Sequence, residues 1–258
     1  ADLRQTLVGG LVDVIVTNRR RGRDDIAIFE VGKGYGRIGD GPHEWWRLGI
    51  GLSGAFDPPA WNRARRTADL DDLKGVVEAL AAELGVQDPA YAALTTEPIL
   101  HPGRAATVVA RDRSGAVVIS GALGEVHPSV AADWDDRTAG ALVAELSIRG
   151  LSGGAVPVPR GITPSRHQDV ERDIAIVVGS DRLATEIDAA IREHAGPLLR
   201  GLRLFDVYRG DPLATDERSL AFRLTFGDPD RTLTESEVET AMAAVTDAVV
   251  AIGGRIRT

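Results

Sequence analysis

Two histidines and one glutamate lie near the ends of strand-like segments, where they could bind a metal ion or transfer protons. His101 is in the segment Leu-His-Pro-Gly-Arg, and Glu125 and His127 are in the segment Gly-Glu-Val-His-Pro. Imidazole and carboxylate groups are ligands for Zn²⁺, and imidazole titrates near neutral pH. Each histidine precedes a proline, however, and such pairs often shape a turn. The sequence therefore favours turns, and a metal or acid/base site is the alternative. We assign no metal ligand and no catalytic residue.

Two glycine-containing motifs match the letters of known functional loops. Residues 32–36, Gly-Lys-Gly-Tyr-Gly, follow an apolar run, but no helical pattern begins after them to direct amide groups at a phosphate. We interpret them as a glycine-rich hairpin turn. Residues 150–154, Gly-Leu-Ser-Gly-Gly, match a nucleophile elbow, which requires a helix directly after the serine. Ala-Val-Pro-Val-Pro follows instead, so Ser152 is interpreted as a linker residue and a hydrolase is poorly supported.

The charge of the chain restricts how it could meet nucleic acid. A formal net charge of -8 argues against a general nucleic-acid binder, because nonspecific binding depends on Lys and Arg neutralising phosphates. Any RNA contact must be local, and no DNA partner is expected. Lys33 and Lys74 are the two lysines, so arginine supplies 28 of the 30 basic residues. Arginine suits bidentate phosphate contacts and stacking on bases.

Length and composition indicate a globular protein. With 258 residues, 43% of them hydrophobic, the chain can form one large domain or two ordinary ones. No segment reaches the roughly 18 to 20 apolar residues that cross a bilayer, and residues 1–5 lack the layout of a signal peptide. The sequence has no cysteine, which fits a reducing compartment. We therefore expect a cytoplasmic protein with no membrane partner.

Apolar periodicity outlines an N-terminal domain over residues 1–150. A first helical stripe consists of Leu7, Leu11, Val14 and Ile15. A second helix is predicted after Asp69, whose side chain can cap it, and its apolar stripe ends at Gly85. Strands are predicted over 26–31, 106–110, 117–123 and 142–148. This order predicts a mainly antiparallel sheet with helices.

A segment rich in glycine and proline, residues 151–166, is predicted to link this domain to a second one over 167–258. The second domain shows the element order βαββαβ, which is typical of the split-βαβ, ferredoxin-like arrangement. Thr234 and Glu237 form a predicted capping box at the start of its last helix. The fold class is therefore α+β.

One sheet face of this second domain is a candidate RNA-binding surface. Alternation predicts a core face with Leu220, Phe222, Leu224 and Phe226. The opposite face would carry Arg203, Phe205, Val207, Arg209 and Arg223. Single-stranded RNA binds such surfaces, with bases stacked on aromatic rings and phosphates contacting arginine. An ordinary solvated sheet face is the alternative, and the pattern alone does not decide between them.

Several motifs resemble the β subunit of bacterial phenylalanyl-tRNA synthetase. In the C-terminal domain these are Leu204-Phe-Asp-Val-Tyr-Arg-Gly210, Ser219-Leu-Ala-Phe-Arg-Leu-Thr-Phe226, Arg231-Thr-Leu-Thr234 and Glu237-Val238. In the N-terminal domain they are Leu3-Arg-Gln-Thr-Leu-Val-Gly-Gly-Leu11, Phe29-Glu-Val-Gly32, Asp72-Leu-Lys-Gly-Val-Val-Glu-Ala-Leu80, His101-Pro-Gly-Arg104 and Gly124-Glu-Val-His-Pro128. The resemblance covers nearly the whole chain, with both modules in the family's order.

The resemblance implies a class II synthetase-like antiparallel sheet module followed by a ferredoxin-like anticodon-binding domain. The whole enzyme would attach phenylalanine to its tRNA, using ATP and Mg²⁺ through the α subunit of an α2β2 assembly. This part would scaffold the α subunit and bind phenylalanine tRNA at the anticodon, without catalytic residues or a cofactor of its own. A stand-alone RNA-binding or interaction protein that reuses both modules is the alternative. By position and chemistry, the candidate RNA-binding residues are Arg172, Arg203, Phe205, Tyr208, Arg209, Arg218 and Arg223.

Overall fold

A computed structural model describes residues 3–39, 41–57, 60–62, 64–86, 89–112, 114–148 and 166–257. The chain divides into two compact units, residues 1–160 and 161–258, and each is considered by itself. Ser152 and nearly all of the predicted linker lie outside the described residues, so both interpretations stay predictions. Among the described residues, no helix has the length and apolar character required to cross a membrane.

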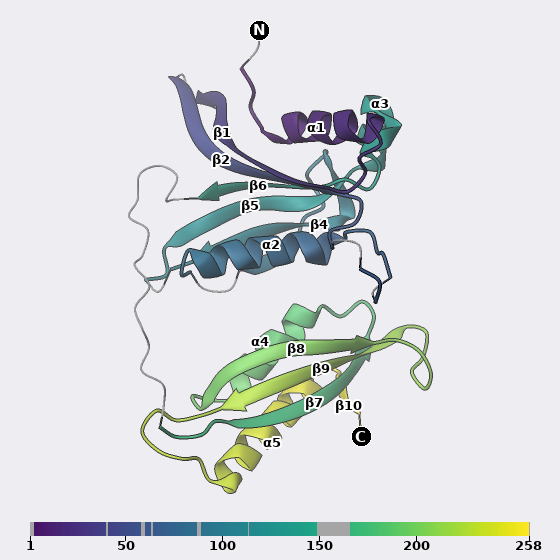
Figure 1. The fold of residues 1–258 in the computed structure, drawn as a ribbon. Coiled ribbons are helices and arrows are strands. Elements are labelled where there is room, and N and C mark those ends of the chain that lie inside the picture. Colours follow the sequence, from purple (N-terminus) through teal and green to yellow (C-terminus); the bar gives the residue numbers. More distant parts are fainter. Residues whose placement is uncertain are drawn as a thin grey trace. The chain divides into compact units, whose positions relative to one another are not determined.

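The N-terminal unit is built on a six-stranded antiparallel sheet with the strand order β1-β2-β6-β5-β4-β3 (Figure 1). The strands are β1 (Ile26–Ile38), β2 (Gly41–Ser53), β3 (Ala90–Ala93), β4 (Leu100–Arg111), β5 (Val117–Val126) and β6 (Leu142–Ile148). The predicted strands all lie within these elements, and β6 has the predicted bounds. A short helix α3 (Pro128–Trp134) and a 3-10 turn η1 (Asp136–Thr138) connect β5 to β6.

Helix α1 (Val8–Arg20) packs on one face of this sheet. It can approach closely because glycine stands at two positions of β2. A Cβ atom at Gly49 would lie 2.8 Å from Cδ1 of Leu11, and one at Gly51 would lie 3.3 Å from Cδ1 of Ile15. The predicted stripe was wrong at Val14, which is 44% exposed. The buried side is centred on Val12 and Ile15 instead.

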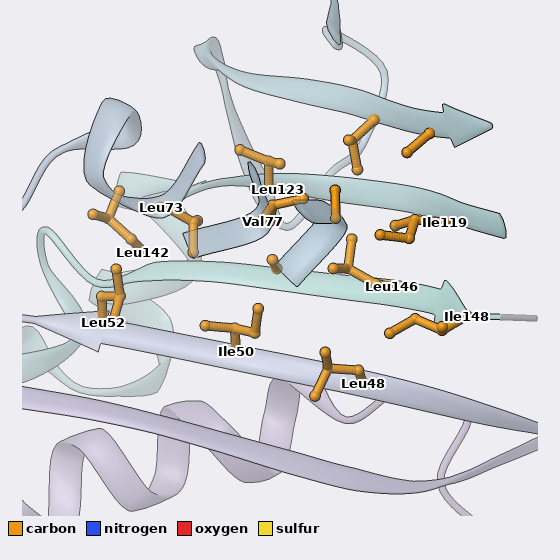
Figure 2. Close-up of a cluster of buried hydrophobic side chains, with 14 of the residues drawn as sticks. Leu48, Ile50, Leu52, Leu73, Val77, Ile119, Leu123, Leu142, Leu146 and Ile148 are labelled. Carbon is orange, nitrogen blue, oxygen red and sulfur yellow. The ribbon is translucent and has the colours of Figure 1, made fainter. Parts of the chain in front are cut away.

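Helix α2 (Leu70–Glu83) packs on the opposite face (Figure 2). Asp69 caps it as predicted, accepting hydrogen bonds from the backbone N–H groups of residues 71 and 72. Gly85 follows the helix with a φ of +65°, which favours glycine. Leu73 and Val77 are fully buried against Leu123, Leu146 and neighbouring side chains of β5 and β6. Apolar burial on both faces holds the helices against the sheet.

The interpretation of residues 32–36 as a hairpin turn was wrong. These residues lie inside β1, which pairs continuously with β2 from Ile26 to Ile38, and the chain turns after it. Glycine is needed there because the ring of Trp45 lies across the strand. A Cβ atom at Gly34 would lie 2.5 Å from Nε1 of Trp45, and one at Gly36 would lie 2.6 Å from its Cη2.

The C-terminal unit has a four-stranded antiparallel sheet with the order β10-β7-β9-β8. Its elements follow the predicted βαββαβ order along the chain. They are β7 (Val170–Gly179), α4 (Ala184–His194), β8 (Leu199–Tyr208), β9 (Glu217–Phe226), α5 (Glu235–Ala251) and β10 (Arg255–Ile256). The capping box of Thr234 and Glu237 is present at the start of α5. The ferredoxin-like arrangement predicted from the sequence is confirmed.

Candidate nucleic-acid interface

Both helices of the C-terminal unit cover the same face of its sheet. Leu220, Phe222, Leu224 and Phe226 of β9 are buried with Ile187 and Ile191 of α4 and Val238, Val245 and Val249 of α5. The alternation predicted for β9 is therefore confirmed. The opposite face, which includes Arg223 at 46% side-chain exposure, is not covered by either helix. We call it the open face.

A β-bulge at Phe205 changes the predicted composition of the open face. Leu204 pairs with Phe222 and Asp206 pairs with Ala221, so Phe205 is the extra residue in β8. The extra residue reverses the alternation beyond it. Val207 lies opposite buried Leu220 and belongs to the helix side, contrary to the sequence prediction.

The same bulge brings Tyr208 to the open face, because this residue pairs with Ser219 of β9. Asp206 reaches the same face opposite Ala221. Arg209 follows the end of β8 and is exposed, outside the ladder of paired residues. The sequence therefore placed Tyr208 among the candidates without predicting its face.

Arg223 and Phe205 form the first of two arginine–aromatic pairs on the open face. The guanidinium carbon of Arg223 lies 5.4 Å from the centroid of the Phe205 ring. Asp173 of β7 accepts two hydrogen bonds from Arg223, each of 2.8 Å, and Glu171 lies 3.5 Å away. The hydrogen bond to Arg223 lowers the pKa of Asp173, and the same hydrogen bond raises the pKa of Arg223. These contacts thus hold the guanidinium group of Arg223 beside the ring.

Tyr208 and Arg257 form the second pair. The guanidinium carbon of Arg257 lies 4.9 Å from the centroid of the Tyr208 ring. The backbone N–H of Arg257 donates to the carbonyl oxygen of Ala175 at 2.8 Å, and the Tyr208 hydroxyl donates to the carbonyl oxygen of Asp211 at 2.7 Å. These contacts fix both partners of the pair on the open face.

Arg255 and Arg257 are open-face residues that the sequence reasoning missed. Arg255 lies opposite Val177 and reaches Glu217 of β9 at 3.1 Å. The carboxylate of Glu217 accepts a hydrogen bond from the backbone N–H of Ala214, and this bond lowers the pKa of Glu217. The contact with Arg255 lowers that pKa further. The two arginines flank Ile256 with the period of a strand, and this alternation was the signal available in the sequence.

Arg203 stands apart from the other arginines of the open face. It pairs in register with Arg223, so both side chains project from the same side of the sheet. Within the described residues, Arg203 has no ion pair or side-chain hydrogen bond. It is the arginine best placed to meet an incoming phosphate.

Two candidate arginines lie on the helix side instead. Arg172 pairs with buried Leu224 and contacts Glu235 at the start of α5, with an N–O distance of 2.5 Å. Arg218 pairs with buried Val178 and donates to the carbonyl oxygen of Arg182 at 2.6 Å. Burial lowers the pKa of Arg218, and the nearby charge of Arg209 lowers it further. The structure therefore does not bring Arg172 and Arg218 together with the open-face residues.

The open face mixes both signs of charge. Its arginines are Arg203, Arg223, Arg255 and Arg257, and its carboxylates are Glu171, Asp173, Asp206 and Glu217. Such a surface attracts phosphate weakly at long range, since its positive and negative charges offset one another. Recognition on it would depend on stacking and on individual arginine contacts, with a modest dependence on salt.

The histidine motifs of the N-terminal unit do not form the turns that the sequence favoured: His101 lies within β4, where the pairing with β5 is irregular between Leu100 and Ala105, and His127 is the N-cap residue of α3. The Nδ1 atom of His101 accepts a hydrogen bond from the backbone N–H of Gly103 at 3.0 Å. The Nδ1 atom of His127 accepts one from the backbone N–H of Ser129 at 3.1 Å and caps α3. Glu125 forms an ion pair with Arg104 at 3.0 Å. Among the described residues there is no group of three or more His, Asp or Glu side chains arranged to hold a metal ion.

Comparisons with known protein families cover both units. Residues 1–148 match the family described as the phenylalanyl tRNA synthetase beta chain CLM domain. Residues 165–257 match the ferredoxin-fold anticodon binding domain. These matches fall in the same order as the two modules of the sequence resemblance.

Individual relatives agree with these matches. The chain is 40% identical to the phenylalanine–tRNA ligase beta subunit of Symbiobacterium thermophilum, over 99% of this chain and 28% of the relative. It is 38% identical to that of Moorella thermoacetica, over 94% of this chain and 30% of the relative. It is 35% identical to the beta subunit of Dechloromonas aromatica, over 94% of this chain and 30% of the relative. The chain thus spans less than a third of the length of these curated relatives.

Proposed function

The chain belongs to the family of phenylalanine–tRNA ligase beta subunits, and from this premise we propose that it joins a catalytic partner subunit to phenylalanine tRNA. The whole enzyme would attach phenylalanine to its tRNA with the use of ATP. In this proposal the N-terminal unit serves as a scaffold, and the C-terminal unit binds tRNA at the anticodon. Both activities belong to translation, so the proposed location is the cytoplasm.

Catalysis is assigned to the partner, the α subunit, in a proposed α2β2 assembly. ATP and Mg²⁺ would bind to that subunit, and we assign no catalytic residue and no cofactor to this chain. The names of the relatives support a partner, because a beta subunit belongs to a complex of different chains. The large antiparallel sheet with a helix on each face provides a rigid platform for such a contact.

The observation that carries the tRNA-binding proposal is the pair of aromatic rings on the open face. Phe205 and Tyr208 are 47% and 38% exposed, and each lies beside an arginine. Aromatic rings stack on unpaired bases of any sequence, and arginine contacts phosphates or stacks as well. An anticodon loop offers unpaired bases. The match of this unit to an anticodon-binding family gives the surface its proposed ligand.

A binding assay with the 258-residue chain tests this proposal. Phenylalanine tRNA and a noncognate tRNA are titrated at low and moderate salt, with Arg203→Ala as a variant. We expect the cognate tRNA to bind more tightly, and we expect Arg203→Ala to reduce the salt slope by about 0.7, the value for one phosphate contact of single-stranded RNA. Equal binding of both tRNAs would contradict anticodon recognition by this chain.

The stand-alone RNA-binding protein is not favoured as an alternative. The similarity to ligase beta subunits extends over 99% of this chain and so includes both units. A protein that reused both modules for another purpose is not favoured, since relatives that match over nearly the whole chain are named as ligase beta subunits.

A further inference from the structure

A cavity lies on the sheet face that carries α1, beside the start of that helix. Its lining comes from the first turn of α1, from β2, β5 and β6, and from the start of β4. Val143 of β6 is buried against α1, and Glu145 and Ser147 follow on the same face with the period of a strand. The volume is about 440 Å³, which is within the range of small-molecule sites. We call it the β6 cavity.

Glu145 is a fixed carboxylate in the β6 cavity. Its Oε1 atom accepts two hydrogen bonds, one of 2.8 Å from the hydroxyl of Thr6 and one of 2.6 Å from the backbone N–H of Leu7. In the described part of the chain, its other oxygen, Oε2, accepts no hydrogen bond, and this atom is not among the buried polar atoms that lack a partner. Oε2 is therefore accessible and available to a ligand.

Arg47 places a positive charge close to Glu145. It lies two residues before Gly49 of β2, which pairs with Glu145, so the two charged residues are diagonal neighbours on one face. Such neighbours lie about 7 to 8 Å apart. The guanidinium carbon of Arg47 is 5.3 Å from the centroid of the Trp45 ring, and its hydrogen bond to the carbonyl oxygen of Trp46 is long, at 3.5 Å. Within the described residues, Arg47 forms no ion pair.

Two opposite charges therefore share the cavity, each held by other groups and not by one another. An isolated anion would meet Arg47 but would be repelled by the nearby carboxylate, and an isolated cation would leave Arg47 without a partner. A ligand that carries both charges satisfies both groups. Charge-assisted hydrogen bonds of this kind are stronger than neutral ones.

The rest of the lining combines hydroxyl groups with aliphatic side chains. Ser120 and Ser147 pair in register, and neither hydroxyl has a hydrogen bond to another described residue. Glu97 adds a second carboxylate, also without an ion pair in the described part of the chain. The apolar lining residues are Val8, Ile99, Leu100, Ala122 and Val143, with no aromatic ring among them. Small-molecule sites commonly combine an apolar lining with a few convergent polar groups.

We propose that the β6 cavity binds a small zwitterion, an α-amino acid with an aliphatic side chain. The ligand carboxylate accepts hydrogen bonds from the guanidinium group of Arg47, and the ligand ammonium group donates to Oε2 of Glu145. The aliphatic side chain packs against the apolar part of the lining. This site lies in the N-terminal unit and is separate from the tRNA-binding proposal. Because Glu145 also holds Thr6 and Leu7, a bound ligand would stabilise the start of α1.

Ligand-observed NMR titrations of the 258-residue chain test the ligand class, with L-leucine as the probe. Isocaproate lacks the ammonium group of leucine, and isoamylamine lacks its carboxylate. We expect L-leucine to bind with a dissociation constant of about 0.1 to 1 mM, and each analogue with one charge to bind at least about tenfold more weakly. Equal binding of leucine and both analogues, or no binding of leucine, would overturn the proposal. Tighter binding of L-phenylalanine than of leucine would overturn the assignment of an aliphatic side chain.

Variants of the 258-residue chain test the location of the site. Arg47→Gln removes the guanidinium charge, and Glu145→Gln removes the carboxylate charge while keeping an oxygen that can accept from Leu7. Arg111→Gln is the matched control, because Arg111 is an exposed arginine of the same sheet outside the cavity lining. Melting temperatures establish that each variant is folded. We expect Arg47→Gln and Glu145→Gln each to weaken leucine binding about 10- to 100-fold, and Arg111→Gln to bind like the parent chain. Unchanged binding by Arg47→Gln and Glu145→Gln would overturn the site.

Discussion

Phe205 and Val207 provide the sharpest test of the open face, because the two side chains are almost equally exposed yet project to opposite sides of the sheet. Phe205 is 47% exposed beside Arg223, and Val207 is 45% exposed opposite Leu220. Simple alternation would place both on the RNA-binding side. The bulge separates them, so truncation of the two side chains should affect tRNA binding differently.

The expected magnitudes follow from the contacts of each residue. Loss of one stacked base costs about 1 to 3 kcal/mol, which corresponds to roughly 5- to 150-fold in the dissociation constant. Phe205→Ala should show an effect of that size, and Val207→Ala should stay within about twofold. The stability changes should be similar and small. Phe205→Ala loses an exposed cation–π contact of about 0.5 to 1 kcal/mol, and Val207→Ala loses two half-exposed methyl groups of comparable value.

Fluorescence anisotropy with phenylalanine tRNA measures the binding, and urea unfolding measures the stability of each variant. Tyr208→Ala serves as a second positive variant, since the bulge brings that residue to the open face. Equal weakening by Phe205→Ala and Val207→Ala would refute the assignment of faces. Equal binding by all three variants would refute the use of this sheet face for RNA.

Three further predictions concern electrostatics and packing. Asp173→Asn should tighten tRNA binding about threefold, because it removes a negative charge next to Arg223 on the open face; weaker binding would mean that the carboxylate is needed to position the arginine. The hydrogen bond from Arg231 lowers the pKa of Glu237 from 4.5 to about 2, so its stabilising effect is present above pH 4.5 and lost as the pH falls towards 2. In acid unfolding, the free energy of unfolding of Glu237→Gln should therefore fall less than that of the parent chain between pH 4.5 and about 2. Gly121→Ala should destabilise the N-terminal unit by about 1 to 3 kcal/mol in urea unfolding, because its Cβ atom would lie 2.1 Å from a backbone carbonyl oxygen of β6; an unchanged midpoint would show that the strands can separate freely.

Local signals in the sequence located most of the elements. Asp69 and Thr234 cap the helices that they were predicted to cap, because the geometry of a helix start depends on only a few neighbouring residues. The alternation in β9 separated the core side from the open side, since burial in a regular strand repeats every two residues. Resemblance to a known family supplied the proposed ligand, which periodicity alone did not.

Two features could not be predicted because they depend on partners far away in the sequence. The extra residue at Phe205 leaves no signal in composition, yet it moves Val207 and Tyr208 to opposite sides from those that simple alternation gives. The glycines at 34 and 36 suggested a turn, whereas their small size makes room for the ring of Trp45 on the neighbouring strand. In both cases the pairing of strands decided the structure.

The most direct test of the central claim is to map where the anticodon meets this chain. An anticodon stem-loop of phenylalanine tRNA, carrying a photoreactive base in the loop, is cross-linked to the 258-residue chain, and the modified peptides are identified by mass spectrometry. Our account predicts cross-links to β8 and β9 at Phe205, Tyr208 and Arg223, with loss of the signal in Phe205→Ala. Cross-links confined to α4, α5 or the N-terminal unit would contradict it.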